Sequence, residues 1–414
     1  MTLAVAPPKY HHEFLSSGVE FAAEEMPERN TVAIMIRLLA GTADSAEEHT
    51  GVAELVEDVL PKGTLTRSGK DLADAFDLLG VKWGGATGRQ STLFRALCLP
   101  EYTHDVIDLL AEFLTQPALD DDVCRVSIEL AQQELKTLED SPDDLVRVMS
   151  QLATYGPRYG RWSGGTTESL EAITPDIMRS FYREFYCAGR MQFAVAGRVH
   201  VEDVAAQLDR CFERFGSGVP AGREDALFPW SPTKQHQSKD LEQEYIAITL
   251  PGATRGTTAF PMEQVMLGVL SGGMSSRLFT EVREKLGLVY WVGAWHEQPR
   301  GSGAIHLGAS TTPARCRKTF ETLLGELKRL GKDVTQEEVD RAKNQIISHA
   351  YTDDDLTRAH ASGLSDDLFH FGKPIGVEPK LDAIRAVRLA DVRAYAKALR
   401  IQELCVCTLG SEKI

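Results

Sequence analysis

The sequence predicts an α+β protein made of two homologous halves. Its 414 residues exceed what one hydrophobic core ordinarily serves, so we expect two domains. The expected strands and helices do not alternate strictly, as they would in a doubly wound parallel sheet. The second half repeats the order of elements in the first, which indicates an old duplication. We expect domains at 1–217 and 241–414, joined by a linker at 218–240 that is rich in Pro, Gly and polar residues.

Apolar periodicity predicts the elements of the first half. Residues 31–41 are almost all apolar, as a central strand should be, and 68–81 has the periodicity of an amphipathic helix. A Gly-rich turn joins two expected strands within 82–100. In order, we expect strands at 14–26 and 31–41, helices at 51–60 and 68–81, strands within 82–100, helices at 101–117 and 121–140, a mainly helical stretch at 141–190 with a loop at 155–166, a strand at 191–199 and a helix at 201–215.

The second half carries the same signals. We expect a strand at 244–252, helices at 260–273 and 275–287, strands at 288–297 and 303–311, helices at 314–331 and 335–351, and a strand at 403–410. Cys405 and Cys407 alternate in the last strand, which favours buried small side chains over metal ligands. Seven cysteines without a C-x-x-C pair are typical of a reducing compartment.

Composition argues against two kinds of partner. The formal net charge of -15 disfavours nucleic acid, because phosphate binding needs clustered Lys and Arg. No apolar run has the length of a membrane span, and no signal-peptide pattern follows the first residue. We therefore expect a cytoplasmic protein without a membrane span.

One short expected helix, within the stretch TGVAELVEDVLPKGT at 50–64, gathers several carboxylates. Its apolar residues recur at helical spacing, and Pro61 ends the pattern. Glu54 and Asp58 stand four residues apart and share a face, while Glu57 lies three residues after Glu54 and next to Asp58. Such a helix is typical of metal-dependent hydrolases, but its residues are unusual for that role.

This stretch resembles the signature helix of the pitrilysin (insulinase) family of zinc peptidases, in which H-x-x-E-H is followed by K-G-T. In that motif the two His bind zinc and the Glu activates the bound water. Residues 62–64 occupy the K-G-T positions and Glu57 that of the catalytic Glu, whereas Glu54 and Asp58 replace both His. The family's third zinc ligand is a Glu in a later helix, and Glu134 matches it.

Further stretches carry the same resemblance. GTTESLEAIT at 165–174, FYREFY at 181–186 and AGRV at 196–199 match the family in sequence and order. Within SGGMSSRLFTEVREKLGLVYWV, Arg283 and Tyr290 occupy positions that contact bound peptide in the family. A guanidinium can anchor a peptide carbonyl and a phenol can donate to an oxyanion. The resemblance implies a clamshell of two half-domains with the fold of the mitochondrial processing peptidase and LuxS type.

The altered residues change the chemistry that the resemblance implies. Zinc prefers imidazole and thiolate, whereas carboxylates suit Mg, Ca or Mn, usually with carbonyl ligands from flexible loops. We therefore expect no cofactor, with Glu54, Asp58 and Glu134 left without a metal and Glu57 idle. Zinc is expected only in a partner subunit.

Without a metal, these crowded carboxylates repel one another. Repulsion of this kind raises pKa values unless a cation neutralises the group. We therefore expect an Arg or Lys against the cluster, with Arg89 and Arg95 as candidates.

Three hypotheses of function follow from the resemblance. The first is a non-catalytic, substrate-binding subunit that pairs with a homologous zinc-bearing chain as a heterodimer, or with itself as a homodimer, and binds an extended peptide at a sheet edge. The second is an assembly or peptide-binding protein without proteolysis. The third is an active metallopeptidase with substituted metal ligands.

Overall fold

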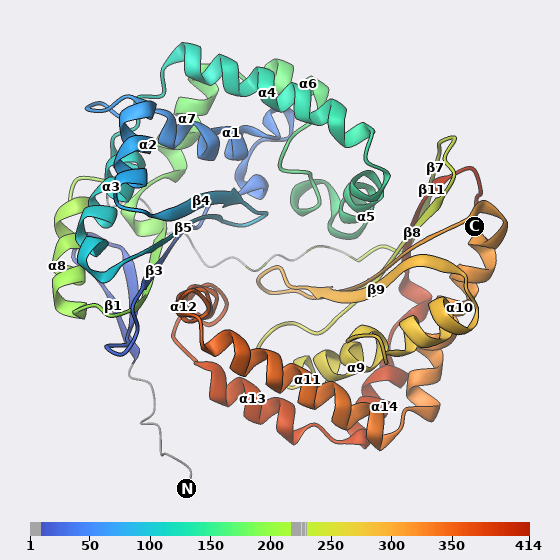
Figure 1. Cartoon of the computed structure of the whole chain (residues 1–414). Helices are drawn as coiled ribbons and strands as arrows, with labels where there is room; N and C mark the ends of the chain where they lie inside the picture. Colours follow the sequence, from blue (N-terminus) through green and yellow to red (C-terminus); the bar gives the residue numbers. More distant parts are fainter. Residues whose placement is uncertain (1–9, 217–224, 226–227, 229) are drawn as a thin grey trace, which may run out of the picture. The chain divides into compact units, whose positions relative to one another are not determined.

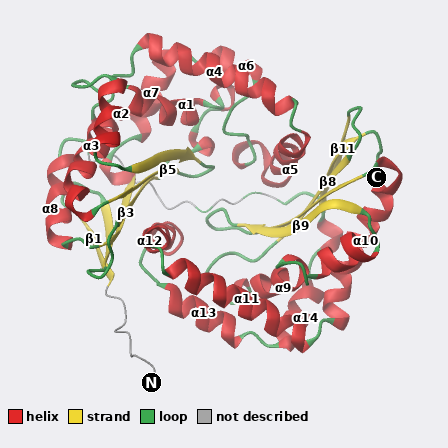
Figure 2. Ribbon diagram, in the orientation of Figure 1, coloured by secondary structure: helices red, strands yellow, loops and turns green. Residues whose placement is uncertain are grey.

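The structure is a computed structural model that describes residues 10–216, 225, 228 and 230–414. Its chain divides into two compact units of mixed α/β structure, each with its own sheet (Figures 1 and 2). Unit 1 consists of Met1–Leu135, Trp162–Arg223 and Asp353–Gly376. Unit 2 consists of Lys136–Arg161, Glu224–Thr352 and Val377–Ile414. The two sheets with their helices confirm the predicted fold class of two mixed α/β half-domains.

Unit 1 contains a six-stranded sheet in the order β1-β2-β6-β3-β5-β4. Only β2 and β6 run parallel among these neighbours. The strands are β1 Tyr10–Phe14, β2 Glu20–Glu25, β3 Val32–Leu38, β4 Lys82–Thr87, β5 Thr92–Cys98 and β6 Met191–Gly197. β6 is buried along its whole length and β3 nearly so, as the apolar run at 31–41 predicted. At the edge, β4 has no strand on its outer side among the described residues.

Helices cover one face of this sheet and enclose the main core of the unit (Figure 1). They are α1 Val52–Val59, α2 Gly69–Leu78, α3 Thr103–Thr115, α4 Asp121–Glu139, α6 Thr167–Ala172, α7 Pro175–Phe185 and α8 Val201–Phe212. The boundary between the two units falls inside α4. The other face of the sheet packs against α12, Thr357–Phe371, through a smaller cluster that includes Met35, Ala194 and Leu364.

Unit 2 contains a five-stranded sheet in the order β7-β11-β8-β10-β9. Its strands are β7 Thr233–Ser238, β8 Glu244–Pro251, β9 Val289–Glu297, β10 Ala304–Thr311 and β11 Cys405–Gly410. Its helices are α9 Phe260–Ser271, α10 Cys316–Asp333, α11 Gln336–Asp354, α13 Val377–Ala386, α14 Leu389–Ala398 and a π-helix, η6, at Leu278–Lys285. The core lies between one sheet face and these helices, and α5, Pro142–Tyr159, packs on β8 and β11 from the other side.

The units differ from the predicted boundaries because each sheet is completed by a helix from the other half of the chain. α5 belongs to unit 2 although it lies within 1–217, and α12 belongs to unit 1 although it lies within 241–414. Each helix covers an apolar sheet face that would otherwise meet water. The apolar periodicity of a helix predicts the helix itself but does not show which of the two sheets it covers.

Three local predictions also need correction. Part of the predicted linker at 218–240 lies outside the described residues, but 233–238 forms β7, an edge strand paired parallel to β11. The strand predicted at 14–26 begins only at Glu20 as β2, because residues 15–19 form a turn, and β1 at Tyr10–Phe14 was not predicted. α5 continues into the predicted loop at 155–166, with a kink at Gly156, where φ is 71° and a Pro follows.

Candidate functional site

Helix α1 forms where the apolar spacing predicted it. It begins after Gly51, whose φ of 107° is left-handed and favours glycine, and it ends at Val59. A short 3₁₀ turn at Leu60–Lys62 contains Pro61 and carries the chain one step further along the helix path. The apolar residues of α1 are buried, while Glu54, Glu57 and Asp58 are only partly accessible.

The structure brings the four predicted carboxylates together. Burial raises the pKa of Glu54, a hydrogen bond from Ser163 opposes that rise, and the charges of Glu134 and Asp58 add to it. Glu134 comes from α4 and is exposed. Burial, followed by the charges of Asp58 and Glu54, raises the pKa of Glu57 to about 7. At neutral pH this cluster therefore holds a carboxyl group that is partly protonated.

Lys62 is the cation that lies against the cluster. Its Nζ donates to Oδ2 of Asp58 over 2.5 Å, and the Oγ of Ser127 on α4 donates to the same oxygen. Lys62 also opposes the rise in the pKa of Glu57. The expectation of a basic partner is confirmed, and the Lys of the K-G-T sequence fills that role.

Of the two arginines named as candidates, Arg95 does not lie at the cluster. Arg95 pairs with Met35 across β5 and β3, and both line a cavity beside α12, on the sheet face opposite α1. Arg89 lies in the turn between β4 and β5, and its carbonyl accepts from the backbone N–H of Ala43. Side chains along β5 alternate between the two faces of the sheet, and Arg95 is at a position that points away from α1.

The residues at the family's zinc positions do not fit zinc. They offer only carboxylates, and Oδ2 of Asp58 already accepts from Lys62 and Ser127. In the part of the chain that the structure describes, no three His, Cys, Asp or Glu side chains are arranged to hold a metal ion. The ammonium group of Lys62 thus balances part of the negative charge of the cluster, at Asp58 and beside Glu57.

The carboxylate of Glu57 lies directly over β4. A Cβ added to Gly85 would stand 1.9 Å from Oε1 of Glu57, so the absence of a side chain at Gly85 makes room for this carboxylate. The same strand pairs with β5 on its inner side and has an open edge among the described residues. Glu57 therefore lies above an edge strand, where an extended chain could align.

Arg283 and Tyr290 are both accessible in unit 2. Arg283 is exposed on the π-helix, and its guanidinium lies 5.0 Å from the centre of the Phe279 ring. Tyr290 is on β9, the edge strand of the second sheet, and 77% of it is exposed. The expectation that they contact a peptide stays a prediction.

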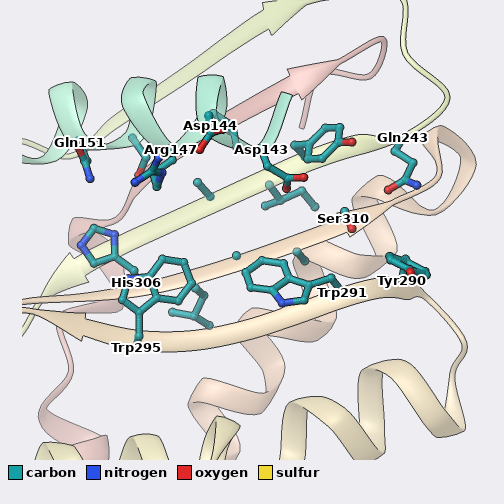
Figure 3. Close-up of a pocket in the computed structure, with 18 of the residues that line it drawn as sticks. Asp143, Asp144, Arg147, Gln151, Gln243, Tyr290, Trp291, Trp295, His306 and Ser310 are labelled. Atoms are coloured by element: carbon teal, nitrogen blue, oxygen red, sulfur yellow. Dashed lines mark hydrogen bonds and ion pairs between the residues drawn. The ribbon is translucent and has the colours of Figure 1, made fainter. Parts of the chain in front are cut away.

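Tyr290 lines a pocket of about 540 Å³ between α5 and the second sheet (Figure 3). Two indoles, those of Trp291 and Trp295, lie on the sheet side and face the first turns of α5, which present Asp143 and Arg147. The sequence analysis did not predict this pocket. The spacing of Trp291 and Trp295 could have indicated it, because residues four apart in a strand point to the same face of the sheet.

The two units with their sheets, and the helix with carboxylates at metallopeptidase positions, define a chain of the zinc-peptidase class of folds. Two family models match it: "Insulinase (Peptidase family M16)" over residues 20–160 and "Peptidase M16 inactive domain" over residues 172–346. The chain belongs to the insulinase family, peptidase family M16.

Curated relatives agree along almost the whole length. An uncharacterized zinc protease of Rickettsia bellii is 28% identical over 408 residues, covering 97% of each chain. The uncharacterized zinc protease YmxG of Bacillus subtilis is 26% identical, covering 95% of this chain and 96% of the relative.

Solved structures share the fold. A peptidase M16 inactive domain from Pseudomonas fluorescens matches with a TM-score of 0.87 at 20% identity, covering 98% of both chains. A protease from Helicobacter pylori matches with a TM-score of 0.89 at 16% identity, covering 97% of this chain and 99% of that one. Separately, no helix among the described residues combines the length and apolar character that crossing a bilayer requires.

Proposed function

We propose that this chain is the non-catalytic, peptide-binding subunit of a two-chain zinc metalloendopeptidase. The observation that carries the proposal is the ion pair between Lys62 and Asp58, at a position where the family motif has a zinc-binding His. Without a metal-bound water, Glu57 has no nucleophile to activate. Zinc and catalysis would then come from a homologous partner chain.

The second half supports the binding role. Arg283 and Tyr290 are both present and exposed, so their polar groups can reach a peptide from outside the fold. Both belong to unit 2, and Tyr290 stands on an edge strand, whose unpaired backbone groups can bind an extended chain. A subunit of this kind contributes binding and orientation of the peptide and leaves cleavage to its partner.

The test is a comparison of the purified chain alone with the same chain mixed with a homologous zinc-bearing chain. We expect no cleavage of a fluorogenic peptide by this chain alone and cleavage by the mixture, which a chelator abolishes. The Tyr290→Phe and Arg283→Gln variants should lower the activity of the mixture, while Met274→Ala, a change at another exposed residue of unit 2, should not.

Two results would favour the other hypotheses. Cleavage by this chain alone, abolished by a chelator, would mean an active metallopeptidase with substituted ligands. Capture of a large assembly without any homologous peptidase, together with absence of peptide binding, would indicate an assembly protein. Light scattering on the mixture and on the single chain separates a heterodimer from a homodimer.

A further inference from the structure

The pocket beside Tyr290 has two partly exposed indoles on its sheet side, those of Trp291 and Trp295, which we call its aromatic floor. Trp291 is 45% exposed and Trp295 is 37% exposed, although an indole ordinarily gains stability from burial. Exposed aromatic side chains that gather in a concave surface are typical of binding sites. The two rings lie side by side, with centres 6.2 Å apart.

Two glycines allow this floor to form. Gly293 of β9 faces Gly308 of β10 across the sheet. A Cβ at Gly308 would stand 2.7 Å from Trp291 and 3.3 Å from Trp295, and one at Gly293 would stand 3.1 Å from Trp291. The Trp291 ring therefore lies over a pair of residues without side chains, and one edge of the Trp295 ring meets Gly308. Figure 3 shows both indoles on the sheet side of the pocket.

A buried polar network holds one end of the floor in place. The Trp295 ring stacks on His306 at a centre distance of 5.6 Å and an angle of 10°. His306 is buried and lies within hydrogen-bond distance of the Tyr155 hydroxyl, at 3.0 Å, and of the Thr249 hydroxyl, at 3.3 Å. Because Tyr155 belongs to α5 and Thr249 to β8, this network ties the floor to two further elements. A floor held in this way loses little freedom when a ligand stacks on it.

The charged groups around the pocket disfavour an acidic ligand, because three carboxylates, those of Asp143, Asp144 and Glu297, line it with Arg147. Asp144 already accepts from Arg147 and from Ser141, both over 2.7 Å. Glu297 accepts from the Tyr155 hydroxyl over 3.0 Å. Burial, followed by the charge of Asp144, raises the pKa of Asp143, so this carboxyl is harder to ionise than an exposed aspartate.

We propose that this pocket binds a large aromatic side chain of the peptide, which stacks on Trp291 and Trp295 beneath α5. The inference rests on the proposed function, since it assumes that a peptide lies along β9, and it adds the class of peptide that the subunit selects. A pocket of about 540 Å³ accommodates a phenylalanine or tyrosine ring with room to spare. Offset stacking on the indoles supplies the preference for a flat ring over an aliphatic chain.

The test uses three synthetic peptides that differ at one position, which is Phe, Ala or Arg, together with the small probe N-acetyl-phenylalanine amide. Binding is followed by calorimetry and by the fluorescence of the exposed indoles. We expect the Phe peptide to bind about tenfold more tightly than the Ala peptide. Trp295→Ala and Trp291→Ala should remove that preference, Trp295→Phe should keep most of it, and Met274→Ala should leave it unchanged.

Equal affinity for the Phe and Ala peptides, or tighter binding of the Arg peptide, would overturn the inference while leaving peptide binding intact. Absence of binding by all three peptides would instead count against the proposed function. In that case the small probe decides about the pocket, because its binding to the wild type and its loss in Trp295→Ala do not depend on a peptide. Unfolding curves of each variant show whether the fold is kept.

Discussion

Lys62 Nζ lies 2.5 Å from Oδ2 of Asp58, one helical turn earlier in the chain. In the family motif these positions are the Lys of K-G-T and the second zinc-binding His. Two changes that look independent in the sequence, the loss of an imidazole and the retention of a lysine, thus form one ion pair. The pair offsets part of the repulsion within the cluster, because Lys62 also opposes the rise in the pKa of Glu57.

The first prediction concerns the stability that Lys62 provides. Lys62→Gln leaves Asp58 and its neighbours without a compensating charge, so we expect a loss of about 0.5–1 kcal/mol in the free energy of unfolding at neutral pH. Urea denaturation measures it. Lys70→Gln is the matched control, because Lys70 and Asp74 also form a Lys–Asp pair four residues apart but are more exposed. An equal loss of stability in both variants would show that Lys62 stabilises the fold no more than an exposed lysine in an ordinary ion pair does.

The second prediction concerns pH. Glu57 has a pKa raised from 4.5 to about 7, so the folded state binds a proton that the unfolded state has released. This contribution to stability is complete below the unfolded pKa of 4.5 and is lost as the pH rises through about 7. Relative to wild type, Glu57→Gln should therefore gain on the order of 2 kcal/mol between about pH 4 and about pH 8.

Glu112 is a control in which stability changes with pH in the opposite direction. Burial alone would raise its pKa, but hydrogen bonds from Thr64, Thr66 and Arg67 lower it overall. Its contribution is present above its unfolded pKa and is lost as the pH falls, so Glu112→Gln should cost stability mainly at neutral pH. Denaturation curves across this pH range compare the two variants. A flat difference between Glu57→Gln and wild type would contradict the raised pKa.

The third prediction concerns metal. Restoring both histidines with Glu54→His and Asp58→His, while Glu134 and Glu57 stay, should create a site that holds about one zinc ion per chain after dialysis. Asp58→His also removes the partner of Lys62, so its ammonium group is released. Elemental analysis gives the metal content, and Glu54→His alone is the control with too few imidazoles. Absence of zinc in the double variant would mean that the backbone has also departed from the binding geometry.

The fourth prediction concerns the attachment of α12 within unit 1. His360 on this helix contacts Oε2 of Glu24 on β2 over 2.9 Å and the carbonyl of Asp354 over 2.8 Å. Burial alone would lower the pKa of His360, but these two partners raise it overall. The contribution is therefore complete below the unfolded pKa of 6.5 and is lost as the pH rises through the folded value.

Hydrogen exchange of α12 is the measurement for this prediction. Protection of the helix should decrease as the pH rises above the unfolded pKa of 6.5, after correction for the intrinsic exchange rate. His360→Gln should show lower protection at the acidic end and a smaller change with pH. If protection in wild type and variant follows the same pH course, the His360–Glu24 contact does not hold the helix.

The sequence by itself determined the family, the two mixed halves and the place of the altered motif. Helix α1 follows from apolar residues at helical spacing ended by Pro61, and the gathering of Glu54, Glu57 and Asp58 follows from their positions on that helix. These features depend on neighbours within a few residues, so they are readable from the chain alone. Lys62 could also have been predicted as the basic partner, since it stands four residues after Asp58. Pro61 instead predicted that the helix ends before Lys62, whereas a 3₁₀ turn continues through it.

Only the tertiary structure decided the contacts between residues far apart in the chain. Helices α5 and α12 pack on the sheets of the opposite halves of the chain. Arg95 lies on the sheet face opposite α1. Gly308 pairs with Gly293 next to the two indoles. Each outcome depends on strand register or on which apolar face a distant helix covers. Such choices are made by the burial of surface across the whole fold, and local spacing carries no record of them.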